Sequence, residues 1–300
     1  AVDGVSFSVE KGRILGIVGE SGCGKSVTSM SILQLLGSNA RISGGSIKLD
    51  GKELIGLPEK EMCRIRGNDI AMIFQDPMTA LNPTLTIGTQ LMEPIMLHQN
   101  CGKKEAWTRA VDVLKRVGIA APEKRMKEYP HQLSGGMRQR VMIAMAVSCE
   151  PRLLIADEPT TALDVTIQAQ ILELMCELRE KMGTAIMLIT HDMGVVAETA
   201  DDVLVLYAGK AVEYGSIEDI FERPKHPYTQ GLLNSIPRLD EDVELLNTIE
   251  GTVPAPDAMP AGCRFAPRCP YGKDRCMKEK PGVYHAGNSL VSCFRYEGEK

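Results

Sequence analysis

Three short apolar runs, each followed at once by polar residues, predict buried strands of a sheet. They occupy residues 14–18, 153–156 and 185–189. Between the last two runs, apolar residues recur at helical spacing from Ile167 to Leu178, and Asp164 stands just before them as a helix-start signal. Ligands bind at the carboxyl ends of strands in open α/β sheets. The pattern therefore predicts an α/β fold with a ligand site where these strands end.

Composition changes twice along the chain. Residues 77 to about 147 are rich in Met, Leu, Ala, Lys and Arg and lack alternating patterns, which predicts a mostly helical insertion. After Phe221, Pro and Gly become frequent, as in residues 251–256, which indicates a loop-rich extension. We expect a main domain over residues 1–222 and a C-terminal extension over 223–300.

A glycine-rich segment between the first predicted strand and a helix fits the phosphate-loop pattern GxxxxGK[ST]. Its residues are Gly19, Glu20, Ser21, Gly22, Cys23, Gly24, Lys25 and Ser26. Glycines let backbone N–H groups turn inward around phosphate oxygens, and the helix N-terminus adds a positive dipole end. We expect Lys25 to reach the β- and γ-phosphates and Ser26 to ligate Mg²⁺. The alternative is a glycine-rich turn with an exposed lysine.

The second predicted strand ends in two carboxylates. Asp157 is placed to hold Mg²⁺, and Glu158 is placed to polarise an attacking water. An ordinary acidic turn before Pro159 would explain this pair alone, but the pair occurs together with a phosphate loop. The two motifs predict an NTPase, and kinases, GTPases and helicases share them.

Residues 133–140, Leu-Ser-Gly-Gly-Met-Arg-Gln-Arg, resemble the signature sequence of ABC ATPases, whose commonest form is LSGGQ. Met137 departs from the usual Gln. Ser134, Gly135 and Gly136 make a second phosphate-binding turn at a helix start, where the plainer alternative is a helix cap with flexible glycines. The resemblance implies a P-loop NTPase core with a helical subdomain, and a dimer in which the signature of one subunit closes on the phosphate loop of the other.

Further motifs of the same family follow in order. Gln75 resembles the glutamine that senses Mg²⁺ and the membrane partner, and residues 162–164, which end in Asp164, resemble the loop that crosses the dimer interface. His191 resembles the switch histidine that contacts the γ-phosphate. The aromatic residue that stacks on adenine in this family is expected before Ala1, so we expect the N-terminus to extend further than this sequence.

Two segments resemble a narrower group, the ATPases of oligopeptide, dipeptide and nickel importers. They are residues 75–83 and 223–229. The resemblance implies a peripheral protein on the cytoplasmic face of the cell membrane that energises peptide uptake, with nickel as the alternative cargo. It also implies a heterodimer with a second related ATPase, two membrane permease subunits and a separate extracellular substrate-binding protein.

Charge and hydropathy argue against a nucleic-acid partner and against a membrane-spanning segment. The formal net charge is −5, whereas proteins that grip nucleic acid usually show a basic excess, so no nucleic-acid partner is expected. No apolar run approaches the roughly 20 residues that span a bilayer. An ABC ATPase acting on DNA or the ribosome remains an alternative, although such proteins usually carry two ATPase units or a long coiled-coil insertion.

Four of the nine cysteines lie close together in the extension. They are Cys263, Cys269, Cys276 and Cys293, separated by five, six and sixteen residues. Four thiolates can complete a zinc site or hold an iron–sulfur cluster, and the spacing alone does not choose between them. Disulfides are disfavoured in a reducing cytosol. Resemblance to peptide-importer ATPases with a four-cysteine tail favours a 4Fe-4S cluster with a structural role, and zinc is the alternative.

Overall fold

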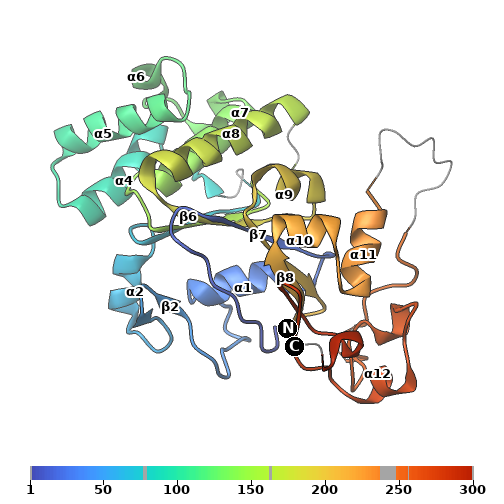
Figure 1. The fold of residues 1–300 in the computed structure, drawn as a ribbon. Helices are drawn as coiled ribbons and strands as arrows, with labels where there is room; N and C mark the ends of the chain where they lie inside the picture. The colour runs from blue at the N-terminus through green and yellow to red at the C-terminus, as the bar shows by residue number, and fades with distance from the viewer. Residues whose placement is uncertain (1, 77–79, 162–163, 237–247, 256, 299–300) are drawn as a thin grey trace. The chain divides into compact units, whose positions relative to one another are not determined.

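The computed structural model of the chain divides into two compact units (Figure 1). The first unit comprises Ala1–Ser8, Ile14–Thr28 and Ile189–Lys300, and the second comprises Val9–Arg13 and Ser29–Leu188. The residues that the structure describes are 2–76, 80–161, 164–236, 248–255 and 257–298.

The first unit is built on a mixed sheet whose strands follow the order β1-β7-β8-β10-β9. Strands β1 (Ile14–Val18) and β7 (Asp202–Tyr207) run parallel, and β8 (Lys210–Ser216) pairs antiparallel with β7. The C-terminal extension adds β10 (Ser289–Val291) to the far side of β8 and then β9 (Tyr284–Ala286), both antiparallel. The extension is therefore tied into the same sheet as the strand that precedes the phosphate loop.

The helices of this unit follow the strands or interrupt the extension. Helix α1 (Lys25–Ile32) begins here with the last two residues of the phosphate loop. The others are α9 (Met193–Thr199), α10 (Ile217–Glu222), α11 (Pro227–Asn234) and α12 (Asp274–Lys278), with single 3₁₀ turns η2 (Ala266–Arg268) and η3 (Phe294–Tyr296). Short helices separated by loops are what the Pro- and Gly-rich composition of the extension predicts.

The second unit contains the strand order β4-β5-β6. Strand β4 (Ile70–Ile73) pairs in parallel with β5 (Leu153–Asp157), and β6 (Ala185–Ile189) is the next strand. A separate hairpin joins β2 (Lys48–Leu49) to β3 (Lys52–Glu53), and α2 (Glu59–Ile65) follows it. Helix α8 (Val165–Met182) runs between β5 and β6, and residues from Ile171 to Leu178 form its buried face.

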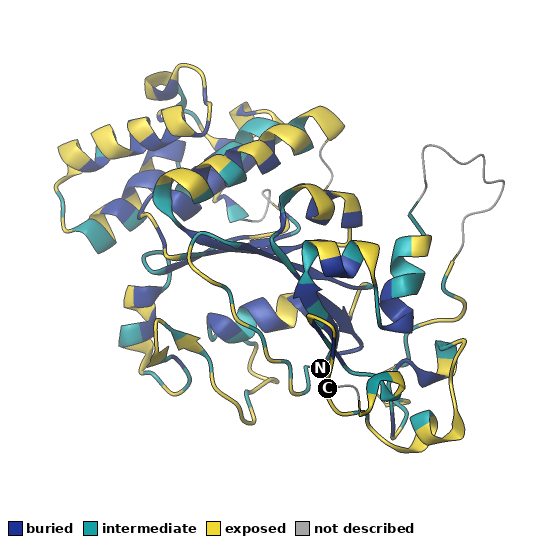
Figure 2. Cartoon of the chain, in the orientation of Figure 1, coloured by how far each residue is buried: buried dark blue, intermediate teal, exposed yellow. Residues whose placement is uncertain are grey.

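The helical part of the second unit packs as a small bundle. It holds α4 (Ile87–Gln99), α5 (Lys103–Arg116), α6 (Pro122–Arg125), the 3₁₀ turn η1 (Pro130–Gln132) and α7 (Gly135–Val147). Helices α4, α5 and α7 contact one another, and their facing side chains, such as Leu91, Leu114 and Val141, are fully buried. Figure 2 shows buried strands and exposed outer faces on α5 and α8, as expected for amphipathic helices.

The predicted α/β class and the three predicted strands are confirmed. The helix predicted to begin near Lys25 begins at that residue, and α4 to α7 lie within the segment predicted to be helical. Apolar and polar residues alternate over residues 5–9 in a strand-like pattern, but this stretch forms no strand. Its side chains alternate between half-buried and exposed, and its backbone is not in a sheet ladder. An alternating pattern specifies a face, whereas a strand also needs a paired neighbour.

None of the helices in the described part of the chain is long and apolar enough to cross a membrane.

Candidate nucleotide site and cysteine cavity

The phosphate loop of the first unit has a backbone that needs glycine. Gly19 follows β1 with φ of +151°, and a Cβ there would lie 2.1 Å from the carbonyl oxygen of Leu206. Gly22 and Gly24 have φ of +77° and +106°, conformations that side chains with a Cβ rarely adopt. The loop can therefore turn tightly between β1 and α1, as the sequence pattern requires.

Lys25 lies inside this loop. Its side chain is buried, and Nζ donates to the carbonyl oxygens of Gly19 at 2.6 Å and Glu20 at 3.2 Å. The sulfur of Cys23 is 3.8 Å from Nζ, and burial raises the pKa of this thiol, so Cys23 is a packing residue of the loop. A cation at the N-terminus of α1 adds to the positive end of the helix dipole, so the electrostatics of this turn favour an anion.

His191 belongs to the same unit as the phosphate loop and is exposed. It stands in the turn between β6 and α9. The following residue, Asp192, caps α9 by accepting from the backbone N–H groups of Gly194 at 2.8 Å and Val195 at 3.3 Å. The cap fixes the chain direction immediately after the histidine.

In the second unit, the end of β5 carries both predicted acidic residues. Asp157 is the last residue of the strand and is buried, and Glu158 follows with φ of +48°. Oε2 of Glu158 accepts from Nε2 of Gln75 at 2.8 Å and from Oγ1 of Thr161 at 2.9 Å. A non-glycine residue held at positive φ is strained, and such strain gathers at functional sites. The structure thus brings Gln75 and Glu158 together, as two hydrogen-bonded predicted catalytic residues.

The signature turn of the second unit starts α7. Ser134 is the N-cap, and its Oγ accepts from the backbone N–H of Met137 at 3.3 Å. A Cβ on Gly136 would lie 3.2 Å from Cγ2 of Ile167 in α8, so the two helices approach closely here. One turn further on, the buried side chain of Gln139 donates to the carbonyl oxygen of Pro159. This bond ties the signature helix to the turn that holds Glu158.

Asp164 caps α8, because its Oδ1 accepts from the backbone N–H of Ile167 at 3.0 Å. This confirms the helix start read from the sequence. Residues 162 and 163 of the predicted interface loop lie outside the described residues, and so do residues 77–79 of the segment that follows Gln75.

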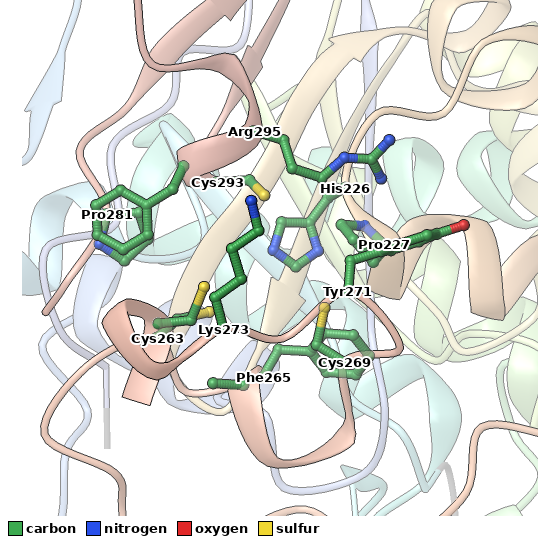
Figure 3. Close-up of a pocket in the computed structure, with 13 residues that line it drawn as sticks. His226, Pro227, Cys263, Phe265, Cys269, Tyr271, Lys273, Pro281, Cys293 and Arg295 are labelled. Atoms are coloured by element: carbon green, nitrogen blue, oxygen red, sulfur yellow. The ribbon is translucent and has the colours of Figure 1, made fainter. Parts of the chain in front are cut away.

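The four clustered cysteines line one cavity of about 80 Å³ in the extension. Figure 3 shows the sulfurs of Cys263, Cys269 and Cys293 around the same space, with the ring of His226 beside them. Cys276 also lines this cavity. Residues separated by up to 30 positions therefore meet at one place, as the prediction of a joint role for the cysteines requires.

Backbone pairing holds this arrangement. The N–H of Gly262 donates to the carbonyl oxygen of Met277 at 3.1 Å, and the N–H of Cys263 donates to that of Cys276 at 2.8 Å. A Cβ on Gly262 would lie 2.3 Å from the carbonyl oxygen of Cys276. Glycine is needed here because the two segments touch through their backbones.

Burial sets the electrostatics of the cysteine cavity. It raises the pKa of the Cys263 thiol to about 11, and it also raises the pKa values of Cys269 and Cys293, with mutual repulsion between the thiolates as a smaller cause. A metal bound here must displace thiol protons. Among the described residues, no group of three or more His, Cys, Asp or Glu side chains is placed to hold a single metal ion.

Sequence reasoning missed several residues that support these sites. Thr161 and Gln139 hold the Glu158 turn, and a Thr or Gln near a motif carries no distinctive signal. Arg268 and Tyr228 contact the phosphate loop from the extension. Tyr228 lies within the segment 223–229 that resembles peptide-importer ATPases, which was the available signal for it.

Comparisons with known proteins agree along the whole chain. The ABC transporter family matches residues 2–161, and the C-terminal region of oligopeptide/dipeptide transporters matches residues 212–276. The oligopeptide transport ATP-binding protein AppD of Bacillus subtilis is 57% identical over 301 residues, covering 100% of this chain and 92% of that protein. The dipeptide transport ATP-binding protein DppD of Haemophilus influenzae is 51% identical, covering 98% of this chain and 89% of that protein.

Solved structures agree with the sequence comparison. The dimeric structure of MJ0796, a bacterial ABC transporter cassette, matches with a TM-score of 0.64 and 29% identity over 72% of this chain and 90% of that one. CbiO1 of Clostridium perfringens, part of an ABC transporter complex, also matches with a TM-score of 0.64, over 74% of this chain and 84% of that one. The fold is that of an ABC ATPase cassette. The chain therefore belongs to the ABC transporter family, among the ATP-binding proteins that carry the oligopeptide/dipeptide transporter C-terminal region.

Proposed function

We propose that this ABC ATPase energises the uptake of peptides through a membrane importer, working on the cytoplasmic face of the membrane. Its relatives are named for oligopeptide and dipeptide transport, and its extension matches the C-terminal region of those transporters. The observation that carries the chemistry is the strained Glu158, whose carboxylate is oriented by Gln75 and Thr161.

The proposed reaction is hydrolysis of the terminal phosphate of ATP. A water molecule attacks the γ-phosphorus while Glu158 accepts a proton from it, and the bond between the γ-phosphorus and the bridging oxygen breaks to leave ADP and inorganic phosphate. Lys25 holds the β- and γ-phosphates, and His191 contacts the γ-phosphate. General-base assistance of this kind contributes typically about 10²–10⁴-fold to the rate.

Each predicted motif carries oxygen donors of the kind that Mg²⁺ takes. Ser26 offers a hydroxyl at the start of α1, Asp157 offers a carboxylate at the end of β5, and Gln75 offers an amide oxygen. Oxygen ligands of this kind suit Mg²⁺. When bound, the ion would supply positive charge that stabilises the negative charge developing on the phosphate during transfer.

The partners follow from the second phosphate-binding turn. Ser134, Gly135 and Gly136 begin α7. We propose that they close on the nucleotide of a second, related ATPase, and that Asp164 lies at that interface. Two permease subunits would carry the peptide, and a separate extracellular protein would select it.

We also propose that the four cysteines hold a 4Fe-4S cluster. A cluster of four irons and four sulfides is larger than one ion, so its ligands spread around a cavity, as these four do. When bound, it supplies cross-links between loops that bury little apolar surface.

Reconstitution tests the transport function. The chain, its partner ATPase, the permease subunits and the binding protein are placed in proteoliposomes, and uptake of a labelled peptide is measured with and without ATP. We expect ATP-dependent uptake with the wild-type chain and little with Glu158→Gln. ATP hydrolysis that is independent of peptide and binding protein, together with no uptake, would contradict the proposal.

A further inference from the structure

One arginine of the extension lies against an acidic residue of the phosphate loop. Nη1 of Arg268 donates to Oε1 of Glu20 at 2.9 Å and to Oε2 at 3.0 Å. The Arg268 side chain is 6% exposed and that of Glu20 is 29% exposed. The two residues are 248 positions apart in the chain, so this ion pair joins the extension to the nucleotide site.

Arg268 is itself held rigidly. Its Nε donates to the carbonyl oxygen of Glu250 at 2.9 Å, and its Nη2 donates to that of Ile249 at 3.1 Å. Nη1 also lies 3.4 Å from the hydroxyl of Tyr207. A guanidinium with its donors engaged on several sides has one orientation, so it fixes the carboxylate that it binds.

A second contact from the extension holds the backbone of the same residue. The N–H of Glu20 donates to the hydroxyl of Tyr228 at 2.9 Å. Tyr228 is fully buried and packs against Tyr207 and Phe265, with ring centroids 4.7 and 5.4 Å away. Both the side chain and the main chain of Glu20 are therefore anchored by the extension.

The anchor is continuous with the cysteine cavity. Arg268 ends η2 and is followed directly by Cys269, and Phe265 lines the cavity while it packs on Tyr207 and Tyr228. The turn is closed by the N–H of Arg268 donating to the carbonyl oxygen of Phe265 at 3.0 Å. The segment between Cys263 and Cys269 thus carries the residue that binds Glu20.

The negative charge of the Glu20 carboxylate is unfavourable for phosphate binding at this loop. A carboxylate in a loop that binds phosphates repels the ligand, and the carbonyl oxygen of the same residue is an acceptor for Lys25. Arg268 neutralises this charge and fixes the orientation of the half-buried carboxylate. Removal of the arginine leaves an unpaired acid beside the phosphates and frees the start of the loop.

We propose that Arg268 is a positioning residue for ATP binding, which neutralises and orients Glu20 and so couples order in the cysteine segment to affinity for ATP. The inference rests on the proposed binding of ATP at the phosphate loop. The extension would therefore contribute to the affinity of the phosphate loop for ATP.

A double-mutant cycle in the assembled transporter tests this. KM for ATP and kcat are measured for wild type, Arg268→Met, Glu20→Gln and the double variant. We expect Arg268→Met to raise KM roughly tenfold, within the range for two directly coupled residues, with kcat changed by less than about twofold. In the Glu20→Gln background the same substitution should raise KM by less than about threefold, because no charge remains to be neutralised. Arg268→Lys should restore part of the affinity, since it keeps the charge without the two-bonded geometry.

Arg264 supplies a matched control in the same segment. Its side chain binds Asp3 at 3.0 Å and the carbonyl oxygen of Ala208, and no contact with Glu20 is among its hydrogen bonds in the described structure. Arg264→Met should leave KM unchanged, with melting temperature and iron content recorded for every variant. An unchanged KM in Arg268→Met, or the full tenfold effect persisting in Glu20→Gln, would overturn the proposal. Wild-type protein that fails to bind ATP would instead refute the underlying function.

Discussion

At the scale of single residues, the turn after β5 orients one carboxylate, that of Glu158, which we propose as the general base. Glu158 is held at positive φ, and its Oε2 accepts two hydrogen bonds from side chains. Glu158→Gln keeps the shape but cannot accept the proton of the attacking water. We expect hydrolysis to fall by about 10²–10⁴-fold while ATP binding is retained. Phosphate release is measured in a complex whose second ATPase site is disabled, and wild-type turnover there would contradict the assignment.

Lys25 provides the contrast at the same scale. Its ammonium lies within the loop and donates to two loop carbonyl oxygens. Lys25→Ala removes the cation closest to the phosphates, so we expect ATP affinity itself to fall by at least about tenfold, measured by equilibrium titration. Retained affinity with lost hydrolysis would instead place Lys25 with Glu158 in the chemical step.

At the scale of elements, the local sequence pattern was sufficient to predict a strand or helix wherever the element's own residues determine its structure. Strands β1 and β6 coincide with the predicted apolar runs, because a fully buried strand is apolar throughout. Helix α1 starts at the residue predicted, since the phosphate-loop motif contains the helix N-terminus. The phosphate loop and the Asp157–Glu158 pair were predicted for the same reason: each is a continuous stretch of sequence.

Features that depend on distant partners were not predictable in this way. The pairing of β10 with β8 and the contact between Arg268 and Glu20 join segments far apart in the chain. Their residues carry ordinary local patterns, because what fixes them is a complementary group elsewhere. The stretch at residues 5–9 shows the converse case, in which a strand-like pattern has no ladder.

At the same scale, the cavity lined by the four cysteines is predicted to hold a 4Fe-4S cluster. Anaerobically purified protein should be brown and contain about four iron atoms per chain. Gly262→Val should reduce the iron by more than about half, because its Cβ would meet the carbonyl oxygen of Cys276 at 2.3 Å and separate two ligand segments. Iron content and visible absorbance are the measurements.

The matched control for this prediction is Gly44→Ala, since a Cβ at Gly44 meets nothing within 4 Å. It should leave the iron content at the wild-type value. Colourless wild-type protein that carries one zinc and no iron would contradict the cluster assignment while leaving the four cysteines as ligands.

At the scale of the whole molecule, two glycine-containing turns stand at helix starts, one at the start of α1 and one at the start of α7. In the proposed function, each nucleotide binds between the phosphate loop of one ATPase and the signature turn of the other. The two turns of one chain therefore contact two different nucleotides when the pair of ATPases closes. The similar cassette MJ0796 has a dimeric structure. Assembly should therefore control activity.

We expect a strictly monomeric preparation to hydrolyse ATP slowly and the heterodimer with a related ATPase to be active. Site-specific substitutions separate the two nucleotides: Lys25→Ala should impair the site on this chain, whereas Ser134→Arg should impair the site on the partner, because the bulky cation blocks the turn that faces the partner's phosphates. Light scattering establishes the oligomeric state, and single-turnover hydrolysis with one site disabled assigns each loss. Vigorous hydrolysis by the monomer would contradict the prediction, because a monomer has no second signature turn to complete its nucleotide site.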